Sequence, residues 1–406
     1  MNSAAGGRAD APEIVLDLSR LVSRVRHRTP TGVDRCEMAY ARELIARVPE
    51  RLSFGVMHPT RRYGRLSGPV ARAFLNATQA AWDGDRPAPA EGGWPALGRT
   101  LWAVRPRPVP PARSRRIFLQ SSPHHLHRRD ATAGILRSEG GARFVCLLHD
   151  LIPHQFPEYA RPGGAALHRR RMRTVAALAD AAIANSDATR DAFMPWLRAA
   201  GREAPVVTAL LGLDAPRGPL PPATRPRPYF LCLGTIEPRK NHLLLLHLWR
   251  RLAEEMGEAC PLLVIVGRRG WENEQVVDML ERCPAITPHI EERAGLPDRE
   301  VAALIAGARA LLLPSFAEGY GLPVPEALVA GTPVIASDLP ALRQAGGGVP
   351  DYLDPLDGLG WMAAIRDYAR ANSPRRAAQL GRLGGWRAPD WGGHIETVLD
   401  VIGALA

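Results

Sequence analysis

Residues 310–337 read ALLLPSFAEGYGLPVPEALVAGTPVIAS, in which two apolar runs enclose a helical pattern. Two apolar runs, at 310–315 and 333–338, flank PEALVAG (325–331), which is predicted to be a short helix that Gly331 ends. Neither run alternates polar with apolar residues, so both faces of each predicted strand are expected to be buried. Buried strands joined by helices predict an α/β fold with a parallel sheet covered on both faces.

The same alternation of apolar runs and helical patterns extends along the rest of the chain. In the second half, strands are predicted at 229–234, 261–267 and 286–295, and helices at 241–256, 271–282, 298–308 and 356–371. In the first half, strands are predicted at 13–19, 51–57, 116–120, 143–149, 181–186 and 205–211. We therefore expect two doubly wound, Rossmann-like domains facing each other across a cleft, with ligands at the carboxyl ends of the strands.

A proline-rich stretch divides the chain near its middle. Residues 215–228 read APRGPLPPATRPRP, with six prolines, which is typical of a semi-rigid linker. The linker separates an N-terminal domain at 1–214 from a second domain at 229–375, and a helical segment at 376–406 follows. A stretch at about 83–116, rich in Pro, Gly and Arg, is interpreted as a long surface loop inside the first domain.

The composition is that of a globular protein and excludes several classes. Of the 406 residues, 46% are apolar and 23% are charged, which argues against disorder. No run approaches the ~18–20 apolar residues of a membrane span, and the first residues, MNSAAGGRADAPE, lack an apolar signal core. Five cysteines without CxxC spacing are interpreted as reduced and cytosolic, with neither a zinc site nor a disulfide framework.

Positive charge is concentrated in the first half of the chain. Residues 1–214 carry 32 arginines against 19 carboxylates, a net charge of +13, whereas residues 215–406 carry a net charge of −2. Such a basic half fits an anionic partner, namely a phospholipid surface, a lipid-phosphate substrate or nucleic acid. The alternative is that the arginines only reflect genome composition and cover solvated faces evenly.

The only lysine of the chain, Lys240, lies in the turn TIEPRKNH (235–242) after a predicted strand. Arg239 and Lys240 precede a predicted helix, for which Asn241 is a candidate N-cap. Free N–H groups at a helix N-terminus, together with two cations, suit a diphosphate. All other basic residues of the chain are arginines, so a single lysine here also favours a phosphate site that needs a compact ammonium. The alternative is a solvated basic turn.

Two glutamates follow the first predicted strand of residues 310–337. Glu318 comes after the strand end, Gly319 and Gly321 allow a tight loop with exposed amides, and Glu326 opens the next helix. One carboxylate can reach the cleft while the other accepts hydrogen bonds from vicinal sugar hydroxyls. The amides between them can meet a further hydroxyl or a phosphate.

Two features at strand ends of the first half complete the candidate site. The run RFVCLLH ends at His149, whose side chain could bond a substrate hydroxyl or carry a proton. PTGVDR (30–35) follows the first predicted strand and opens a helix, and Gly32 lets the backbone approach a ligand closely. The alternatives are a structural histidine and an ordinary turn.

Taken together, these residues resemble retaining glycosyltransferases of family 4, two-domain enzymes of the GT-B fold. The likeness is carried by YFLCLGTIEPRKNH, LLVIVGRRGW, LLLPSFAEGYGLPVPEALVAGTPVIASDLPAL and YLDP in the second half, and by TGVDR, HDLIPHQFPE, AIANSDATRDAF and LLGLD in the first. EPRKNH and HDLIPHQFPE look most like the branch that contains bacterial mannosyltransferases of O-antigen and exopolysaccharide assembly. The stretch at 60–116 carries no such likeness.

The resemblance implies two sets of site residues. The catalytic set is His149, Glu318 and Lys240. The donor-binding set is Arg239, Lys240, Gly319, Tyr320, Gly321, Leu322, Glu326 and Gly32.

Individual roles follow from the same resemblance. His149 would lie beside the O6 of the transferred sugar and the reaction centre, and Glu326 would hold the ribose. Gly32 would line the donor phosphate or the acceptor entrance. Many members of the family have an arginine directly after the strand glycine, where this chain has Thr235, so Arg239 is expected to compensate at the diphosphate.

The implied activity is retaining transfer of a hexose, with mannose from GDP-mannose as the best candidate, onto a glycan or lipid-linked acceptor in polysaccharide biosynthesis. No metal and no cofactor besides the nucleotide-sugar donor is expected, and no DxD motif lies at a predicted strand end. The alternatives are a UDP-sugar-dependent transferase, a sugar-nucleotide epimerase or phosphorylase of the same fold, and a catalytically silent relative. A nucleic-acid-binding protein is a further alternative, against which the 6% aromatic content argues.

The resemblance and the charge together suggest where the protein acts. A cytoplasmic protein is expected, peripheral on the inner face of the cell membrane, whose basic run HRRRMR (168–173) and cluster Arg20, Arg24, Arg26 and Arg28 contact anionic lipid. The C-terminal segment with its tryptophans is expected to pack back on the first domain, as in related enzymes.

Overall fold

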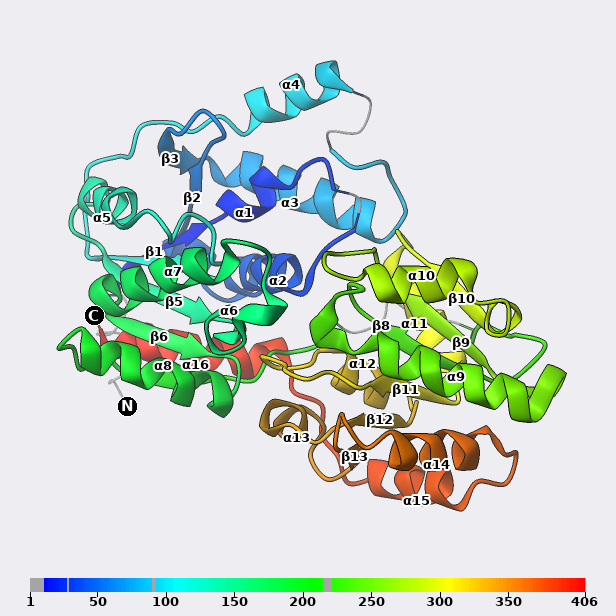
Figure 1. Ribbon diagram of the computed structural model, residues 1–406. Helices are drawn as coiled ribbons and strands as arrows, with labels where there is room; N and C mark the ends of the chain where they lie inside the picture. The colour runs from blue at the N-terminus through cyan, green and yellow to red at the C-terminus, as the bar shows by residue number, and fades with distance from the viewer. Residues whose placement is uncertain (1–10, 28, 90–92, 215–220, 406) are drawn as a thin grey trace, which may run out of the picture. The chain divides into compact units, whose positions relative to one another are not determined.

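The computed structural model describes residues 11–27, 29–89, 93–214 and 221–405, and these residues form two compact units. Unit 1 contains the described residues as far as His154, together with Gly163–Asp214 and the residues from Asp390 onward. Unit 2 contains Gln155–Pro162 and the described residues from 221 to Pro389. Each unit is built around one twisted sheet (Figure 1).

The sheet of unit 1 has seven strands in the order β3-β2-β1-β4-β5-β6-β7. Their bounds are β1 (Glu13–Asp17), β2 (Leu52–Met57), β3 (Tyr63–Leu66), β4 (Arg116–Gln120), β5 (Arg143–Leu148), β6 (Ala181–Ala184) and β7 (Val206–Thr208). All neighbours are parallel except β2 and β3, which form an antiparallel edge. The chain winds outward from β1 in both directions, which is the doubly wound arrangement.

Helices cover this sheet and include one that was not expected. They are α1 (Ser19–Ser23), α2 (Gly32–Arg47), α3 (Gly68–Trp82), α4 (Trp94–Ala103), α5 (Arg129–Ser138), α7 (Gly164–Leu178), α8 (Asp187–Ala199) and α16 (Trp391–Ala404), with α6 (Ile152–Gln155) at the boundary with unit 2. The stretch at 83–116, expected to be a loop, therefore contains α4. Its apolar residues recur at helical spacing, at Trp94, Leu97 and Leu101, and Pro95 lies in the first turn, where proline is tolerated.

The sheet of unit 2 has six strands in the order β10-β9-β8-β11-β12-β13, all of them parallel. They are β8 (Tyr229–Leu233), β9 (Leu262–Val266), β10 (Ile290–Arg293), β11 (Ala310–Leu313), β12 (Val334–Ser337) and β13 (Asp351–Leu353). The helices are α9 (His242–Met256), α10 (Glu274–Arg282), α11 (Asp298–Gly307), α12 (Pro323–Val329), α13 (Pro340–Gly346), α14 (Gly358–Ala369) and α15 (Pro374–Leu383). Short 3-10 helices occur at η1 (Pro49–Arg51), η2 (Pro157–Tyr159), η3 (Pro238–Lys240), η4 (Gly257–Ala259) and η5 (Thr287–His289).

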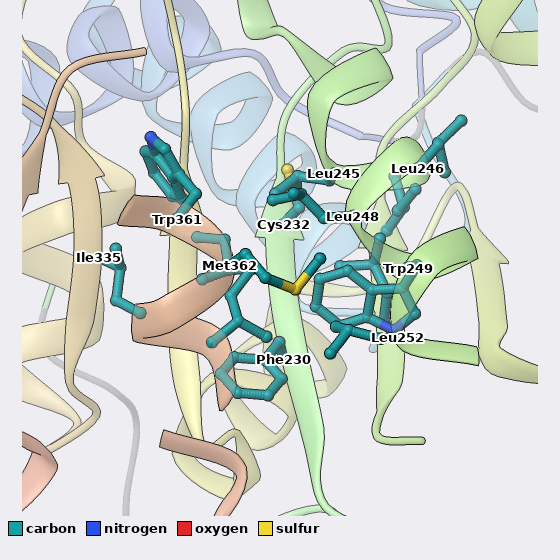
Figure 2. Close-up of a cluster of buried hydrophobic side chains, with 14 of the residues drawn as sticks. Phe230, Cys232, Leu245, Leu246, Leu248, Trp249, Leu252, Ile335, Trp361 and Met362 are labelled. Atoms are coloured by element: carbon teal, nitrogen blue, oxygen red, sulfur yellow. The ribbon is translucent and has the colours of Figure 1, made fainter. Parts of the chain in front are cut away.

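Strand β8 shows why the strands of unit 2 read as continuous apolar runs. Successive side chains of a strand point to opposite faces. Phe230 and Cys232 pack with Trp249 of α9 and Trp361 of α14 on one face, as Figure 2 shows. The alternate residues of β8 pack with α11 and α12 on the other face. The polar edge of the buried Trp249 ring is satisfied, because its Nε1 donates to the carbonyl of Pro261 at 2.9 Å.

The second half of the predicted linker is bound to unit 2. The backbone N–H of Ala223 donates to the carbonyl of Ala303 at 2.9 Å, and Arg225 forms a bidentate ion pair with Glu291. Arg227 donates to several carbonyls of the same unit. Residues 221–228 are therefore anchored to unit 2, and the other linker residues lie outside the described part of the chain.

The predicted C-terminal segment divides between the two units. Trp386, which follows α15, packs against the core of unit 2. Trp391 begins α16 in unit 1 and is 6% exposed. On the same helix, His394 bonds Tyr40 of α2 through Nε2 at 2.8 Å. The described residues of unit 1 therefore include α16 but not α15.

Candidate functional site

Lys240 is held at the carboxyl end of β8 by the backbone around it. Gly234, directly after β8, has a φ of 133°, and a Cβ there would lie 3.3 Å from the Cε of Lys240. The bare glycine backbone thus gives the lysine stem room to pass. Lys240 ends η3, is 8% exposed, and lies two residues before α9 begins. Its ammonium therefore lies near a strand end and a helix N-terminus.

The partner of this ammonium comes from the loop after the neighbouring strand β11. The Nζ of Lys240 donates to Oε1 of Glu318 at 2.5 Å, and the hydroxyl of Ser315 donates to the same oxygen at 2.7 Å. The other carboxylate oxygen lies 2.9 Å from Nη1 of Arg239. Both oxygens of Glu318 are thus held by donors from two loops at the same edge of the sheet.

These neighbours keep Glu318 ionised although its side chain is only 7% exposed. Burial by itself would raise the pKa of the carboxyl group. The charges of Arg239 and Lys240, and the hydrogen bonds from Lys240 and Ser315, outweigh burial and lower the pKa of Glu318 to about 2. The cluster is a buried network of charges that neutralise one another.

Arg239 ties this network to its own turn. Its Nε and Nη2 donate to Glu237 at 3.0 and 2.7 Å, and its Nη1 donates to the carbonyl of Ala317 at 2.6 Å. The guanidinium is therefore directed at the Glu318 loop, and its contact with a diphosphate stays a prediction. Asn241 does not cap α9 with its side chain as expected, because it has a φ of 55° and donates to the carbonyl of Pro355 instead.

The other predicted donor residues of unit 2 lie in the turn between Glu318 and α12. Gly321 has a φ of 88°, and a Cβ there would lie 2.2 Å from Leu342, so only glycine fits. Tyr320 is 3% exposed, so its side chain packs inward. Leu322 precedes α12, and Glu326 is half-buried in the first turn of that helix. The structure brings these residues to the same loop as Glu318, and their contacts with a donor stay predictions.

His149 lies in unit 1, directly after β5. Its Nε2 is 2.8 Å from the carbonyl of Ser121. A carbonyl only accepts, so Nε2 carries the proton and Nδ1 is an acceptor in the neutral ring. Burial lowers the pKa of His149, which favours this neutral form. Its backbone carbonyl accepts from Nδ2 of Asn185 at 2.8 Å.

Gly32, also in unit 1, opens α2 behind a capping box. Thr31 accepts from the N–H of Asp34, and the Asp34 carboxylate accepts from Thr31 in return. Asp34 is 1% exposed and pairs with Arg20 at 2.6 Å and with Arg24 at 2.8 Å. These two arginines, expected to face lipid, therefore neutralise a buried carboxylate; Arg28 lies outside the described residues. The donor contact of Gly32 stays a prediction.

Two groups near the Lys240 site were not singled out from the sequence. Tyr159, in the short segment of unit 2 that follows His154, stacks on Phe316 with ring centroids 5.7 Å apart and planes 7° apart. Phe316 in turn donates its N–H to the carbonyl of Arg239. No local pattern signals this contact, because the two aromatic residues are far apart in the sequence.

Arg268 is the second such group. Its position directly after a predicted strand is the signal that could have identified it, because ligands are expected at strand ends. It follows β9 in the sequence GRRGW, and its carbonyl accepts from the N–H of Ile236 at 2.9 Å, in the turn that leads to Lys240. Its side chain is exposed and makes no ion pair with any residue that the structure describes. Its neighbour Arg269 pairs with Glu281 and Glu292.

Comparison with solved structures shows the class of fold. HepE of Anabaena, in complex with UDP and glucose, aligns with a TM-score of 0.60 and 14% identity over 96% of this chain and 99% of HepE. The trehalose 6-phosphate synthase of Burkholderia multivorans aligns with a TM-score of 0.59 and 14% identity over 97% and 99% of the two chains. The fold is therefore that of the GT-B glycosyltransferases, as predicted.

Comparison of sequences adds a family region. Residues 222–345, which include Lys240, Glu318 and Glu326, match the family model described as Glycosyl transferases group 1. O-antigen chain mannosyltransferase B of Escherichia coli is 37% identical over 129 residues, 32% of this chain and 33% of that protein. The serotype-specific mannosyltransferase WbdA of Escherichia coli is 29% identical over 219 residues, 50% of this chain and 27% of that protein.

O-antigen chain mannosyltransferase RfbU of Salmonella typhimurium is a further relative, 30% identical over 141 residues, 34% of this chain and 38% of that protein. The matches thus span only 27–38% of the length of these three relatives. The resemblance to O-antigen mannosyltransferases that the motifs predicted is confirmed.

Proposed function

We propose that this chain is a retaining hexosyltransferase that moves mannose from GDP-mannose to a glycan or lipid-linked acceptor in polysaccharide biosynthesis. The observation that carries the proposal is the buried cluster of Lys240, Arg239 and Glu318 at the carboxyl edge of the sheet of unit 2. It lies within the region that matches the glycosyltransferase family model. The relatives of that region that are named above are mannosyltransferases.

The cluster has the chemistry that departure of a nucleoside diphosphate requires. An ammonium has three donors, and the structure gives one of those of Lys240 to Glu318. Lys240 can therefore bind a phosphate oxygen without releasing the carboxylate. Together with Arg239 and the N-terminus of α9, it would stabilise the charge that develops on the leaving diphosphate. The proposal needs no metal for this step.

Glu318 is a poor candidate for a covalent nucleophile. Both of its oxygens accept hydrogen bonds or ion pairs, and its low pKa, about 2, makes the carboxylate weakly basic. Its proposed role is to orient the transferred sugar through a hydroxyl. The acceptor hydroxyl would attack the anomeric carbon on the face that the diphosphate leaves. That hydroxyl would pass its proton to the departing phosphate oxygen, and the anomeric configuration would be retained.

His149 has a different proposed role, because it is neutral. With Nε2–H bound to Ser121, its Nδ1 can accept a hydrogen bond from a hydroxyl of the transferred sugar. A neutral imidazole in this role orients the sugar and carries no charge. His149→Ala should then lower turnover while leaving the affinity for the free nucleoside diphosphate close to that of the wild-type protein.

A thermal-shift panel tests the donor. GDP and GDP-mannose are expected to raise the melting temperature of the protein, because a ligand that binds only the folded state stabilises it. UDP-, ADP- and other GDP-sugars serve as the comparison. A shift with UDP-sugars and none with GDP-sugars would replace the GDP-mannose proposal by the UDP-sugar alternative. Release of a free epimerised sugar nucleotide without acceptor would indicate the epimerase.

We also propose that the acceptor is presented at an anionic membrane surface, which the protein binds peripherally. Support comes from the net charge of +13 in residues 1–214. Within the described residues, no helix is long and apolar enough to cross a membrane. Vesicle co-sedimentation at low and high salt tests this part of the proposal.

A further inference from the structure

Helix α4 presents two large aromatic side chains to solvent. Trp94 is 78% exposed and Trp102 is 68% exposed, whereas Ala96 is the residue of the helix that is buried. In Figure 1, α4 lies at the outer edge of unit 1. A single exposed apolar residue is normal, but two exposed tryptophans on one short helix form an apolar feature of the kind that marks an interaction site.

The two indoles are about 12 Å apart along the helix axis and about 80° apart around it, as eight residues of an α-helix dictate. A flat surface can therefore contact both at once. Leu97 and Leu101, which lie between them in the sequence, are half-buried, so part of each side chain stays open to solvent. The exposed side of α4 is thus an apolar stripe rather than a single stray residue.

Arginines surround this stripe. The guanidinium of Arg105 lies 3.7 Å from the centroid of the Trp102 ring, and that of Arg26 lies 5.5 Å from the Trp94 ring. Arg99 and Arg107 are exposed nearby. From Arg86 to Arg115 the sequence has six arginines and a single acidic residue. The surface of α4 is therefore aromatic and strongly basic at the same time.

We propose that α4 is the element that docks unit 1 onto an anionic phospholipid surface, with Trp94 and Trp102 in the interfacial layer. Tryptophan favours this layer because its ring is apolar and its N–H is polar. Basic side chains beside it meet the lipid phosphates. The net positive charge selects an anionic bilayer over a neutral one. This inference gives a location to the membrane contact and rests on that part of the proposed function.

The basic run on α7 offers a rival location. Arg169, Arg170 and Arg173 are exposed there, but His168 and Met172 are buried and no exposed aromatic side chain accompanies them. Such a face attracts lipid by charge alone, and salt screens that attraction. Docking through α4 adds an apolar contribution that salt does not screen. The two locations therefore differ in both residue dependence and salt dependence.

The test is co-sedimentation of the full chain with vesicles of phosphatidylglycerol and phosphatidylcholine, against vesicles of phosphatidylcholine alone. Trp94→Ala/Trp102→Ala is expected to weaken binding to the anionic vesicles roughly tenfold or more, because two indoles lose their burial. The matched control is Leu356→Ala/Leu359→Ala, which removes two side chains of unit 2 that are 79% and 76% exposed. The control should bind as the wild-type protein does.

A second readout keeps the proposal testable if the double variant is unstable. Phosphatidylglycerol brominated in the acyl chain should quench part of the tryptophan fluorescence, and Trp94→Phe/Trp102→Phe should remove that part. A nucleotide-induced thermal shift equal to that of the wild-type protein shows that the variants are folded and that the donor site is independent of α4.

Each outcome decides the proposal. Loss of binding in the Trp variant alone supports α4. Binding that survives in the Trp variant but falls in Arg169→Gln/Arg170→Gln/Arg173→Gln assigns the contact to α7 and overturns the inference. Equal recovery of wild-type protein in the supernatant with both vesicles overturns the membrane contact itself, and would leave a protein partner to explain the exposed tryptophans.

Discussion

Glu318 in unit 2 and Asp17 in unit 1 are both buried carboxyl groups at the carboxyl edge of a parallel sheet, and they differ in charge. The pKa of Glu318 is lowered to about 2, whereas that of Asp17 is raised to about 7. Burial acts in the same direction on both groups. The difference is that Glu318 contacts Lys240 and Arg239, whereas Asp17 makes no ion pair with any described residue.

In unit 1, Asp17 and Glu37 of α2 therefore retain protons more readily than Glu318 does, whereas Asp34 is paired with Arg20 and Arg24. Asp17 accepts from Ser19, and Glu37 of α2 accepts from the N–H of Leu21 at 3.0 Å. Burial, and then the nearby charge of Asp17, raise the pKa of Glu37 as well. Arg20, whose charge acts on Glu37, is itself paired with Asp34. A low-charge environment of this kind suits uncharged ligand groups, whereas that of unit 2 suits a diphosphate.

Buried polar atoms without a hydrogen-bond partner occur in both units. Among the described residues, Oε2 of Glu37, Oγ of Ser121 and Oδ1 of Asn185 are buried without a hydrogen-bond partner. Such atoms are costly unless something pairs with them. In unit 2, both ring nitrogens of His242 and Oγ of Ser337 are likewise buried without a partner. The two units therefore differ in the cations beside their buried carboxyl groups, Glu318 and Asp17, and not in unsatisfied hydrogen bonds.

The strongest way to break the comparison is to remove the lysine. Lys240→Ala should abolish most turnover and weaken nucleoside diphosphate binding roughly 10- to 100-fold, because a charged hydrogen bond contributes about 1.5–3 kcal/mol. Isothermal titration calorimetry measures the affinity. Arg250→Ala, an exposed cation on α9, is the control that should bind normally. An affinity in Lys240→Ala equal to that of the wild-type protein would exclude Lys240 from the donor site.

Lys240 and Glu318 could be found from the sequence because each lies in the loop after a strand that the pattern predicts well. Strand β4 coincides with its predicted range, and β8 and β11 start at the predicted residue. Strand β3 was missed, because it is short and contains Arg65, which is buried by ion pairs with Glu13 and Glu139. From sequence alone, an arginine is predicted to be exposed, because the distant carboxylates that allow its burial are not known.

Particular contacts between distant segments could not be predicted for the same reason. For the C-terminal segment, the resemblance implied a return to the first domain and named no contact. The stacking of Tyr159 on Phe316 and the bond between His394 and Tyr40 depend on how the chain passes between units, which local periodicity does not encode. The pairing of Arg20 and Arg24 with Asp34 was also not predicted, and it removes two charges from the expected lipid-binding cluster.

A second prediction concerns the ribose end of the donor. Glu326→Ala should weaken nucleotide binding about tenfold, since it removes a charged acceptor for the ribose hydroxyls. Glu300→Ala is the matched control: Glu300 is also in the first turn of a helix, α11, and its side chain is 48% exposed. Equal affinities for GDP in the two variants, measured by calorimetry, would remove Glu326 from the site.

The two adjacent arginines after β9 allow a smaller and sharper test. Arg268 makes no ion pair among the described residues, whereas Arg269 is held by two glutamates. If the cations that contact the diphosphate include the loop after β9, Arg268→Ala should weaken GDP binding a few-fold, and more strongly at low salt. Arg269→Ala should change the affinity less. The reverse order would limit the donor contacts to the Lys240 turn.

The smallest effect tests the two carboxyl groups directly, through stability. Because the pKa of Asp17 is raised from its ordinary value to about 7, folded protein holds a proton that unfolded protein has released between about pH 4 and 7. The free energy of unfolding should therefore fall as the pH rises through this window. Asp17→Asn cannot titrate and keeps an acceptor for Ser19, so its melting temperature relative to the wild-type protein should rise by a few degrees from pH 5 to pH 8.

Glu318→Gln should do the opposite at neutral pH. The pKa of Glu318 is lowered to about 2, so its ionised form stabilises the fold above about pH 4.5, and that stability is lost as the pH falls toward 2. Removing the charge also leaves Lys240 buried beside a neutral amide. At pH 8 the Gln variant should melt below the wild-type protein and the Asn variant above it, as measured by calorimetry. Melting-temperature shifts of the same sign in the two variants would mean that the cations beside Glu318 do not set it apart from Asp17.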